Sequence, residues 1–343
     1  MSKVFVLFIL FLSALFNLAI AQWQSVLVHY DSGNKLVYAL DPENNRIPDF
    51  SYAGYRNGEA EIPNIAVIKT ISPISGDNTV YIQSVMDSLG NAGATGALLL
   101  LQGNYEIWGT LKLKYSGLVL RGSGDGSDSL TNTILKGKGD TPTQRTILVA
   151  GGGSSSLWKD QVSGTKTNIT SDTILVGSRE FYVENAAPYS IGDNIIIYHP
   201  CTAEWLQAVD YGGTHSVSPD QDTAWAVNSQ PIVYNRYIKA ISGNKITIDV
   251  PVFNHLIKSL SQSYIYKYSR SGLKTNIGIE NLRIDIETLG GEDESHPWQA
   301  VDLYQLEDSW VRNCTFLHFG QSGIRINTGT RITVDNCKAL DPV

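Results

Sequence analysis

The sequence predicts an all-β fold, a parallel β-solenoid, and three observations lead to this prediction. A six-residue sequence motif, in the order apolar, charged, Asn, apolar, polar, apolar, recurs around Asn281, Asn313 and Asn336. The steps between these asparagines are 313 − 281 = 32 and 336 − 313 = 23 residues, and the longer step contains a polar run at residues 292–297. Short apolar runs bounded by glycine recur upstream, and one short helical pattern precedes them. Coils of this length stack so that they bury one continuous core.

The first residues have the features of an export signal. Lys3 precedes an apolar run over residues 4–18, and Ala19-Ile20-Ala21 is a small-x-small cleavage site. We expect residues 1–21 to be a secretory signal peptide, because the run is short for a stable membrane span. No second such run follows. We therefore expect a secreted chain, extracellular or periplasmic, with no membrane span after signal cleavage.

Residues 22–343 are expected to form the β-helix domain, beginning with a turn-rich arm at 22–75. A short capping helix follows at about 77–90, with Asp77 or Asn78 as its N-cap. Its apolar residues fall at helical spacing: Val80, Ile82, Val85, Met86 and Leu89. Such a helix would cover the open edge of the first coil.

Strand-like runs follow the helix. The expected coil strands near residues 97–101, 105–107, 111–113, 118–121, 133–137 and 147–149 are apolar and bounded by glycine-rich turns. Residues 237–241 and 246–248, joined by Ser-Gly-Asn, predict an antiparallel hairpin.

An inserted loop is expected at about 199–235. It contains Trp205 and Trp225, and long loops on rigid scaffolds are often functional. The two indoles would either stack on pyranose rings or anchor the loop to the β-helix.

The net charge is −7 over 343 residues, which argues against a nucleic-acid partner, because phosphate binding needs a basic face. It does not exclude an acidic glycan, since a local basic cluster can lie on an acidic protein. Aromatic residues make up 10% of the chain, enough to supply sugar-stacking rings beside those that pack the core.

The repeat also predicts which charged side chains share a face. Asp302 and Arg325 are 325 − 302 = 23 residues apart and should lie one coil apart in one outward column. Arg283, Thr315 and Lys338 should form an outward column on another face. Asp285 and Glu287 project outward on the first of these coils, and His318 lies near the end of the equivalent strand.

Two further motifs bear a family resemblance. Gly76-Asp77-Asn78-Thr79 with the following Ile82-Gln83, and Asp49 to Tyr55 reading Asp-Phe-Ser-Tyr-Ala-Gly-Tyr, resemble the pectate-lyase-like superfamily. The resemblance runs from about Ile47 to Val343 and implies a secreted, single-stranded, right-handed parallel β-helix. That superfamily includes polysaccharide lyases, glycoside hydrolases, epimerases and phage tailspikes. The polygalacturonase Asp-Asp and Gly-His-Gly signatures are absent.

The charges favour a lyase that cleaves an acidic, uronate-containing polysaccharide by β-elimination. The expected catalytic residues are Asp302, Arg325, His318 and Lys338. Saccharide would be bound by Trp205, Trp225, His296 and Trp298. No cofactor is required, although Ca²⁺ held by Asp285 and Glu287 would suit such a reaction.

Two alternatives remain open. A glycoside hydrolase needs paired carboxylates, which Asp285, Glu287, Asp302, Glu307 and Asp308 would supply. A non-catalytic carbohydrate-binding or adhesion β-helix is the second. Convergence of Asp302, Arg325, His318 and the 199–235 loop on one groove would favour an enzyme, and scattered positions would favour a binding module.

The last coil poses two further questions. Cys314 and Cys337 occupy one column and point inward, so they are close enough either to bond or to remain stacked thiols. No capping pattern follows the last copy of the repeat, and we expect the chain to be truncated at its C-terminus.

Overall fold

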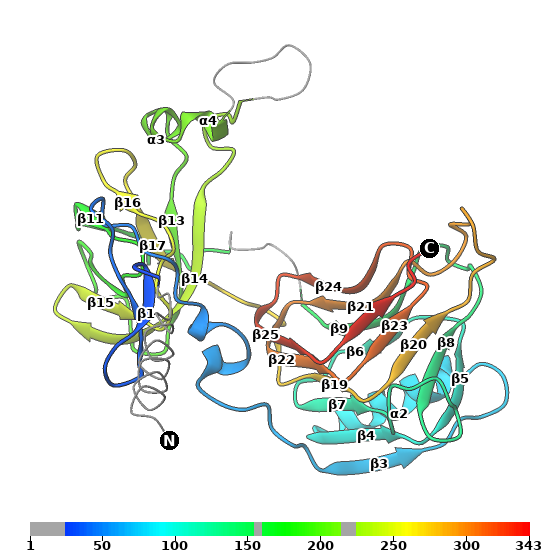
Figure 1. Ribbon diagram of the computed structural model, residues 1–343. Helices are drawn as coiled ribbons and strands as arrows, with labels where there is room; N and C mark the ends of the chain where they lie inside the picture. Colours follow the sequence, from blue (N-terminus) through cyan, green and yellow to red (C-terminus); the bar gives the residue numbers. More distant parts are fainter. Residues whose placement is uncertain (1–24, 154–159, 214–223) are drawn as a thin grey trace, which may run out of the picture.

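The computed structural model describes residues 25–153, 160–213 and 224–343, and it contains two bodies of β-sheet joined side by side (Figure 1). One body is a parallel β-helix, and the other is an antiparallel sheet inserted into it. The predicted signal peptide, residues 1–21, lies outside the described residues. Among the helices of the described part, none is long and apolar enough to cross a membrane.

The β-helix has three sheets, each built from parallel strands of successive coils. The first sheet has the order β18-β22-β19-β7-β4-β3, and β25 also pairs with β22. Its strands are β3 (Val67–Ile71), β4 (Gly96–Leu100), β7 (Leu118–Arg121), β18 (Lys274–Thr275), β19 (Gly278–Glu280), β22 (Leu306–Arg312) and β25 (Thr330–Asp335).

The second and third sheets complete each coil. The second sheet contains β5 (Gly103–Ile107), β8 (Thr133–Gly137), β20 (Arg283–Ile286), β23 (Thr315–Leu317) and β26 (Lys338–Leu340). The third contains β6 (Leu111–Leu113), β9 (Thr146–Gly151), β21 (Gln299–Tyr304) and β24 (Ser322–Asn327). The predicted all-β class with parallel sheets is therefore confirmed.

The repeated motif forms one corner of the last three coils. Nδ2 of Asn313 donates to Oδ1 of Asn281 at 3.0 Å, and Nδ2 of Asn336 donates to Oδ1 of Asn313 at 2.8 Å. Their φ angles are 54°, 53° and 48° in chain order 281, 313, 336, a left-handed conformation that Asn tolerates better than most residues. The three amides line up along one axis, as the repeat predicts.

The core lies between the three sheets. Inward-facing Ile279, Ile284, Val311 and Phe316 are completely buried, because side chains alternate between the two faces of each strand. Cys314 is also completely buried and packs below Cys337, and both carry free thiols. Burial of apolar surface is the main stabilising contribution of such stacking.

The predicted helix is present as α2 (Thr79–Asn91). It buries Ile82 and Met86 against the core of the first coil. The Thr79 N–H donates to Oδ1 of Asp77 at 2.8 Å, which satisfies a backbone group that the start of a helix leaves without an intrahelical partner. The helix thus packs against the first coil, as expected of a capping element.

The inserted sheet lies between β9 and β18, and its strands pair antiparallel in the order β10-β17-β13-β14-β15-β12. They are β10 (Thr167–Asn168), β12 (Glu180–Tyr182), β13 (Asn194–His199), β14 (Ile232–Ser242), β15 (Lys245–Ile248) and β17 (Tyr264–Lys267), with a separate pair of β11 (Thr173–Ile174) and β16 (Leu256–Ile257). It has its own core, which includes Ile195, Ile197, Ile238 and Ile265.

The insertion is larger than the loop expected at about 199–235. That loop is one connection within the inserted sheet, between β13 and β14, and carries α3 (Ala203–Ala208) and α4 (Asp210–Gly213) (Figure 1). Apolar runs of similar length occur in parallel and in antiparallel sheets. The periodicity of the sequence therefore did not distinguish the strands of the inserted sheet from those of the β-helix. The hairpin of β14 and β15 was predicted correctly.

The N-terminal arm joins both bodies. Its hairpin of β1 (Val28–Tyr30) and β2 (Leu36–Tyr38) is followed by two 3-10 turns, η1 (Phe50–Tyr52) and η2 (Tyr55–Gly58). The expectation that the arm packs on the first coils holds for β3, which pairs with β4. The turns instead reach the last coil, where the Tyr55 N–H donates to Oγ1 of Thr333 at 2.8 Å.

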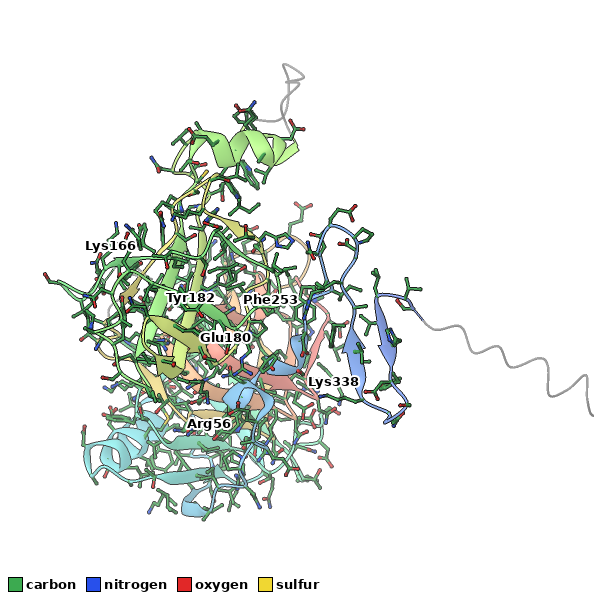
Figure 2. The ribbon with its side chains drawn as sticks, turned by 90° about the vertical axis from the view of Figure 1, so that its left-hand side faces the viewer. Arg56, Lys166, Glu180, Tyr182, Phe253 and Lys338 are labelled. Atoms are coloured by element: carbon green, nitrogen blue, oxygen red, sulfur yellow. The ribbon has the colours of Figure 1, made fainter. Side chains whose placement is uncertain are left out.

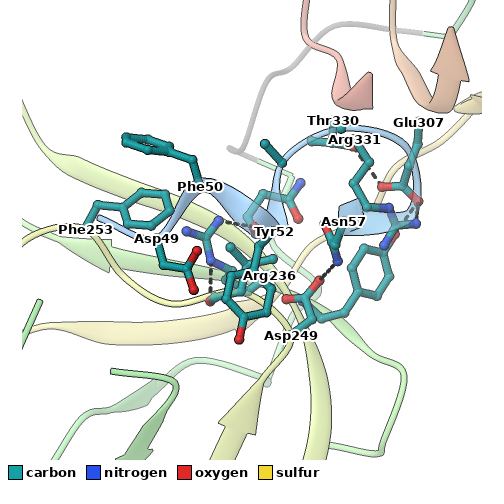
Figure 3. A pocket seen from close by; sticks show the side chains of 15 residues that line it. Asp49, Phe50, Tyr52, Asn57, Arg236, Asp249, Phe253, Glu307, Thr330 and Arg331 are labelled. Atoms are coloured by element: carbon teal, nitrogen blue, oxygen red, sulfur yellow. Dashed lines mark hydrogen bonds and ion pairs between the residues drawn. The ribbon is translucent and has the colours of Figure 1, made fainter. Parts of the chain in front are cut away.

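A cluster of charges around two buried carboxylates links the inserted sheet to the β-helix, and Figure 3 shows two of its members, Glu307 and Arg331. This junction cluster consists of Glu307 and Asp308 with Arg56, Arg270 and Arg331. Arg270, which leads back from the inserted sheet, pairs with Glu307, and Arg331 bridges Glu307 and Asp308 at 2.8 and 2.7 Å.

The inserted sheet adds hydrogen bonds to this cluster. The Tyr237 hydroxyl donates to Glu307 at 2.8 Å, and Nδ2 of Asn57 donates to the buried Asp249 at 3.0 Å. Carboxylates with so many donors are charge-neutralised within the protein itself. The junction cluster therefore holds the two bodies together.

Candidate functional site

The outer face of the second sheet carries a charged groove. Glu106 of β5, Lys136 of β8 and Asp285 of β20 are register neighbours on adjacent parallel strands, so their side chains point to the same outer face. The groove has a volume of about 580 Å³ and is lined by Asn104, Glu106, Lys136, Lys138, Asp285, Ile286, Glu287, Thr288 and His318. Three of the sequence-predicted site residues meet here: Asp285, Glu287 and His318.

Asp285 lies at the centre of the groove. Its Oδ2 accepts from Nζ of Lys136 at 2.6 Å, and its Oδ1 lies 2.8 Å from Nδ1 of His318. Burial alone would raise the pKa of Asp285, but hydrogen bonds from Lys136 and His318 outweigh it and lower that pKa. Asp285 is therefore an anion at neutral pH and is unsuited to act as a general acid.

His318 directly follows β23, at the end of the strand beside β20. Its φ of 55° is in the left-handed region, where the chain turns out of the sheet. Because Asp285 is ionised, Nδ1 of His318 is assigned as the donor of their hydrogen bond. In the neutral imidazole, Nε2 then carries the lone pair and is the ring nitrogen that can accept a proton.

The groove contains a second lysine–carboxylate pair. Nζ of Lys138 lies 2.6 Å from Oε1 of Glu287, and this hydrogen bond raises the pKa of Lys138. Glu106 accepts from Nε1 of Trp108 at 3.1 Å. The side chain of Glu287 is 54% exposed, so solvent or a ligand can compete for the Lys138 ammonium group.

Asp302 and Arg325 form the predicted pair, but on the third sheet. Their strands β21 and β24 are in register, and Nη2 of Arg325 lies 2.5 Å from Oδ2 of Asp302. Lys338 lies on the second sheet in a column with Arg283 and Thr315, as predicted. Lys338 and Thr315 both approach Asp125, at 3.4 and 2.7 Å.

The predicted saccharide contacts are dispersed. His296 is 2% exposed and its Nδ1 lies 2.7 Å from the carbonyl oxygen of the adjacent Pro297, so its side chain is buried and does not face solvent. Trp298 donates to the Glu294 carbonyl oxygen at 3.3 Å within the same loop. Trp205 stacks against Trp225 at 6.3 Å with an interplanar angle of 9°, at the α3 end of the inserted sheet.

The predicted convergence is therefore not found. His318 meets Asp285 on the second sheet, Asp302 and Arg325 lie on the third, and the 199–235 loop belongs to the inserted sheet. By the criterion stated for these residues, their dispersal favours a binding module. A different set, centred on Asp285, does converge.

The proposed metal ligands are paired with lysines. Asp285 contacts Lys136, and Glu287 contacts Lys138. Across residues 25–153, 160–213 and 224–343, no group of three or more His, Cys, Asp or Glu side chains is placed to hold a metal ion.

Glu106, Lys136 and Lys138 were missed as site residues. They precede the inserted sheet, whereas Asp285 and His318 follow it, so the repeat spacing is interrupted between the two halves of the groove. Strand 133–137 was predicted, and pairing it with the strand that contains Asp285 would have placed Lys136 beside that carboxylate.

No protein-family model and no curated protein matches this chain. Among solved structures, the chain is similar to the tailspike protein of Pseudomonas phage LKA1, with 14% identity over 74% of this chain and 39% of that chain and a TM-score of 0.41. A tailspike of Acinetobacter baumannii bacteriophage AP22, in complex with a capsular saccharide, has 13% identity over 77% and 44%, with a TM-score of 0.36.

A mannuronan C-5 epimerase A-module of Azotobacter vinelandii is a further similar structure. It has 12% identity over 80% of this chain and 51% of that chain, with a TM-score of 0.26. The chain spans about two fifths to one half of the length of these structures.

Proposed function

We propose that this protein is a secreted enzyme of the pectate-lyase-like, right-handed β-helix type that cleaves an acidic polysaccharide by β-elimination. The charged groove on the second sheet is the proposed active site. The observation that carries the proposal is the contact between Asp285 and His318, which leaves one imidazole nitrogen available as a base.

In the proposed reaction, Nε2 of His318 removes the proton from C5 of a uronate ring. The electron pair of the C5–H bond forms the C4=C5 double bond, and the bond between C4 and the glycosidic oxygen breaks. Water protonates the departing oxygen. Asp285 stabilises the imidazolium that forms on His318, so it acts as a positioning residue.

Lys136 and Lys138 supply the positive charge that this chemistry needs. A uronate carboxylate must be neutralised before its C5 proton becomes acidic enough to remove, and two ammonium groups lie in the same groove as His318. Arg283 and Lys338 lie farther along the same sheet and would extend binding.

A glycoside hydrolase is the second enzyme class that the groove admits. It would use Glu106 and Glu287 as acid and base, since Asp285 is held as an anion. A binding module without catalysis is the third possibility, and the dispersal of Asp302, Arg325 and Trp205 favours it.

The test is a panel of polygalacturonate, alginate, glucuronan, xylan and cellulose derivatives, each assayed for unsaturated uronate absorbance and for reducing ends. Both signals are expected with an acidic polymer. Reducing ends alone would assign a hydrolase, and neither signal would assign a binding module. The matched variants are His318→Ala in the groove and His29→Ala on β1, with activity lost only in the first.

A further inference from the structure

We propose that a second polysaccharide-binding site lies on the face of the inserted antiparallel sheet opposite its own core, at a tyrosine patch of Tyr198, Tyr264 and Tyr266. The ligand class, an acidic polysaccharide, rests on the proposed function. The site itself is separate from the charged groove, and its argument depends on the geometry of the inserted sheet alone.

Strand alternation places the tyrosine patch on the face opposite the core of the inserted sheet, where Ile196 and Tyr266 are themselves buried. Ile195, Ile197 and Ile265 point into the core of the inserted sheet and are completely buried. Tyr198 and Tyr264 are cross-strand partners on the opposite face, and Tyr266 is the partner of Ile196. Tyr198 and Tyr264 are half-buried, so part of each ring remains accessible to solvent.

The tyrosine rings form a contiguous platform in which the rings contact one another, and the Tyr264 ring is covered on its face by the Lys166 ammonium group. The Tyr198 and Tyr264 rings stack at a centroid distance of 5.1 Å and an interplanar angle of 22°. Tyr264 and Tyr266 follow at 6.2 Å and 34°. The accessible parts of Tyr198 and Tyr264 combine apolar ring carbons with a polar hydroxyl tip, which suits a pyranose because its C–H bonds are apolar and its rim is polar.

A cavity of about 440 Å³ lies over this platform. It is lined by Gln161, Tyr198, Asn228, Ser229, Pro231, Tyr264 and Tyr266. Burial raises the pKa of Tyr198 and Tyr264, so both hydroxyls stay protonated and can donate. Amides and hydroxyls beside aromatic surface provide the few polar contacts that orient a bound ligand.

The local charge favours an acidic glycan. Nζ of Lys166 lies 3.7 Å from the centroid of the Tyr264 ring, and Figure 2 places Lys166 at the edge of the inserted sheet. Among the described residues that line the cavity, none carries a carboxylate. A uronate approaching the platform would therefore meet the Lys166 cation at its edge.

The experiment measures retention of the full chain in native gels that contain polygalacturonate, alginate or neutral hydroxyethylcellulose. His318→Ala is the common background, so cleavage does not affect migration. Retention by an acidic polymer is expected, and Tyr198→Ala with Tyr264→Ala should weaken it about thirtyfold, since each of the two aromatic contacts contributes roughly 1 kcal/mol. Tyr182→Ala, an exposed tyrosine of β12, should change nothing.

Two further variants keep the test informative if the alanines unfold the sheet. Tyr198→Phe should keep most of the retention because the ring remains. Lys166→Gln should weaken retention by the acidic polymers and reduce its salt dependence.

Unchanged retention of a folded Tyr198→Ala, Tyr264→Ala protein would overturn the proposal, as would retention by the neutral polymer alone or by none of the three. These outcomes are independent of the lyase assay, because retention is measured without turnover. A protein that binds through the tyrosine patch but cleaves nothing would contradict only the proposed reaction.

Discussion

The junction cluster and the charged groove use the same chemistry in different surroundings. In both, a carboxylate lies between cations on the parallel β-helix. The side chains of Glu307 and Asp308 are each 5% exposed, whereas those of Asp285 and Glu287 are 17% and 54% exposed. Buried ion pairs cannot be exchanged for water or ligand without a large cost, and exposed ones can. Burial therefore separates charges that hold the fold from charges that are available to a substrate.

The largest expected effect is at the junction. Glu307→Ala would leave Arg270 and Arg331 without their shared carboxylate in a buried environment. We expect the free energy of unfolding to fall by about 3–5 kcal/mol, measured by urea denaturation. A loss below about 1 kcal/mol would show that water reaches the cluster, and the proposed difference between the two regions would then disappear.

The next effect concerns catalysis and not stability. His318→Ala should lower the rate of β-elimination about 100-fold or more, because a positioned base typically contributes that much. The free energy of unfolding should stay nearly unchanged. Asp302→Asn, on the third sheet, serves as the comparison and should keep most of the activity. Equal rate losses in both variants would indicate that the groove was assigned to the wrong sheet.

The two regions should also differ in acid. Burial would raise the pKa of Glu307, but Arg270 and Arg331 lower it, so its folded pKa is below the unfolded value. Its contribution to stability is then present above about pH 4.3 and is lost as the pH falls through the folded pKa. Denaturation between pH 6 and pH 3 should show a weaker pH dependence in Glu307→Gln than in the wild type.

Asp285→Asn should change the pH dependence of stability less than Glu307→Gln does. The pKa of Asp285 is also lowered, so the sign is identical, but its side chain is more exposed and it has fewer cationic partners. A greater flattening in this variant than in Glu307→Gln would contradict the ranking.

The smallest effect is expected at the exposed end of the groove. Glu287→Ala removes the carboxylate that pairs with Lys138, and exposed pairs contribute about 0–1 kcal/mol. The unfolding midpoint should hardly move, while binding of an acidic polymer should become stronger because Lys138 is released. Weaker binding would instead favour Glu287 as a direct ligand contact or a Ca²⁺ ligand.

Much of the β-helix was predictable because a stacked coil repeats its own geometry. The line of Asn281, Asn313 and Asn336 and the pairing of Asp302 with Arg325 followed from residue spacing alone. Only part of the groove could be predicted. Asp285 and His318 lie within the repeat, but Lys136 lies before the inserted sheet. Because the insertion interrupts the regular spacing, residue numbers alone do not show which residues before and after it are neighbours on adjacent strands.

The course of the inserted chain at the end of β9 has a structural consequence. The backbone at Gly153 passes very close to Gly272. A Cβ atom added to Gly272 would lie only 2.5 Å from the Cα of Gly153. The strand β9 that ends here is paired with β21 of the next turn, from Thr146 opposite Gln299 to Gly151 opposite Tyr304. β9 and β21 therefore pair as neighbouring coils although the inserted sheet separates them in sequence, and the insertion leaves and re-enters the β-helix at one place. A chain that ran directly from Gly152 to Leu273 would keep this pairing but would lose Arg270 and Tyr237, so the buried Glu307 would lose two of its partners and would have to be replaced together with the insertion.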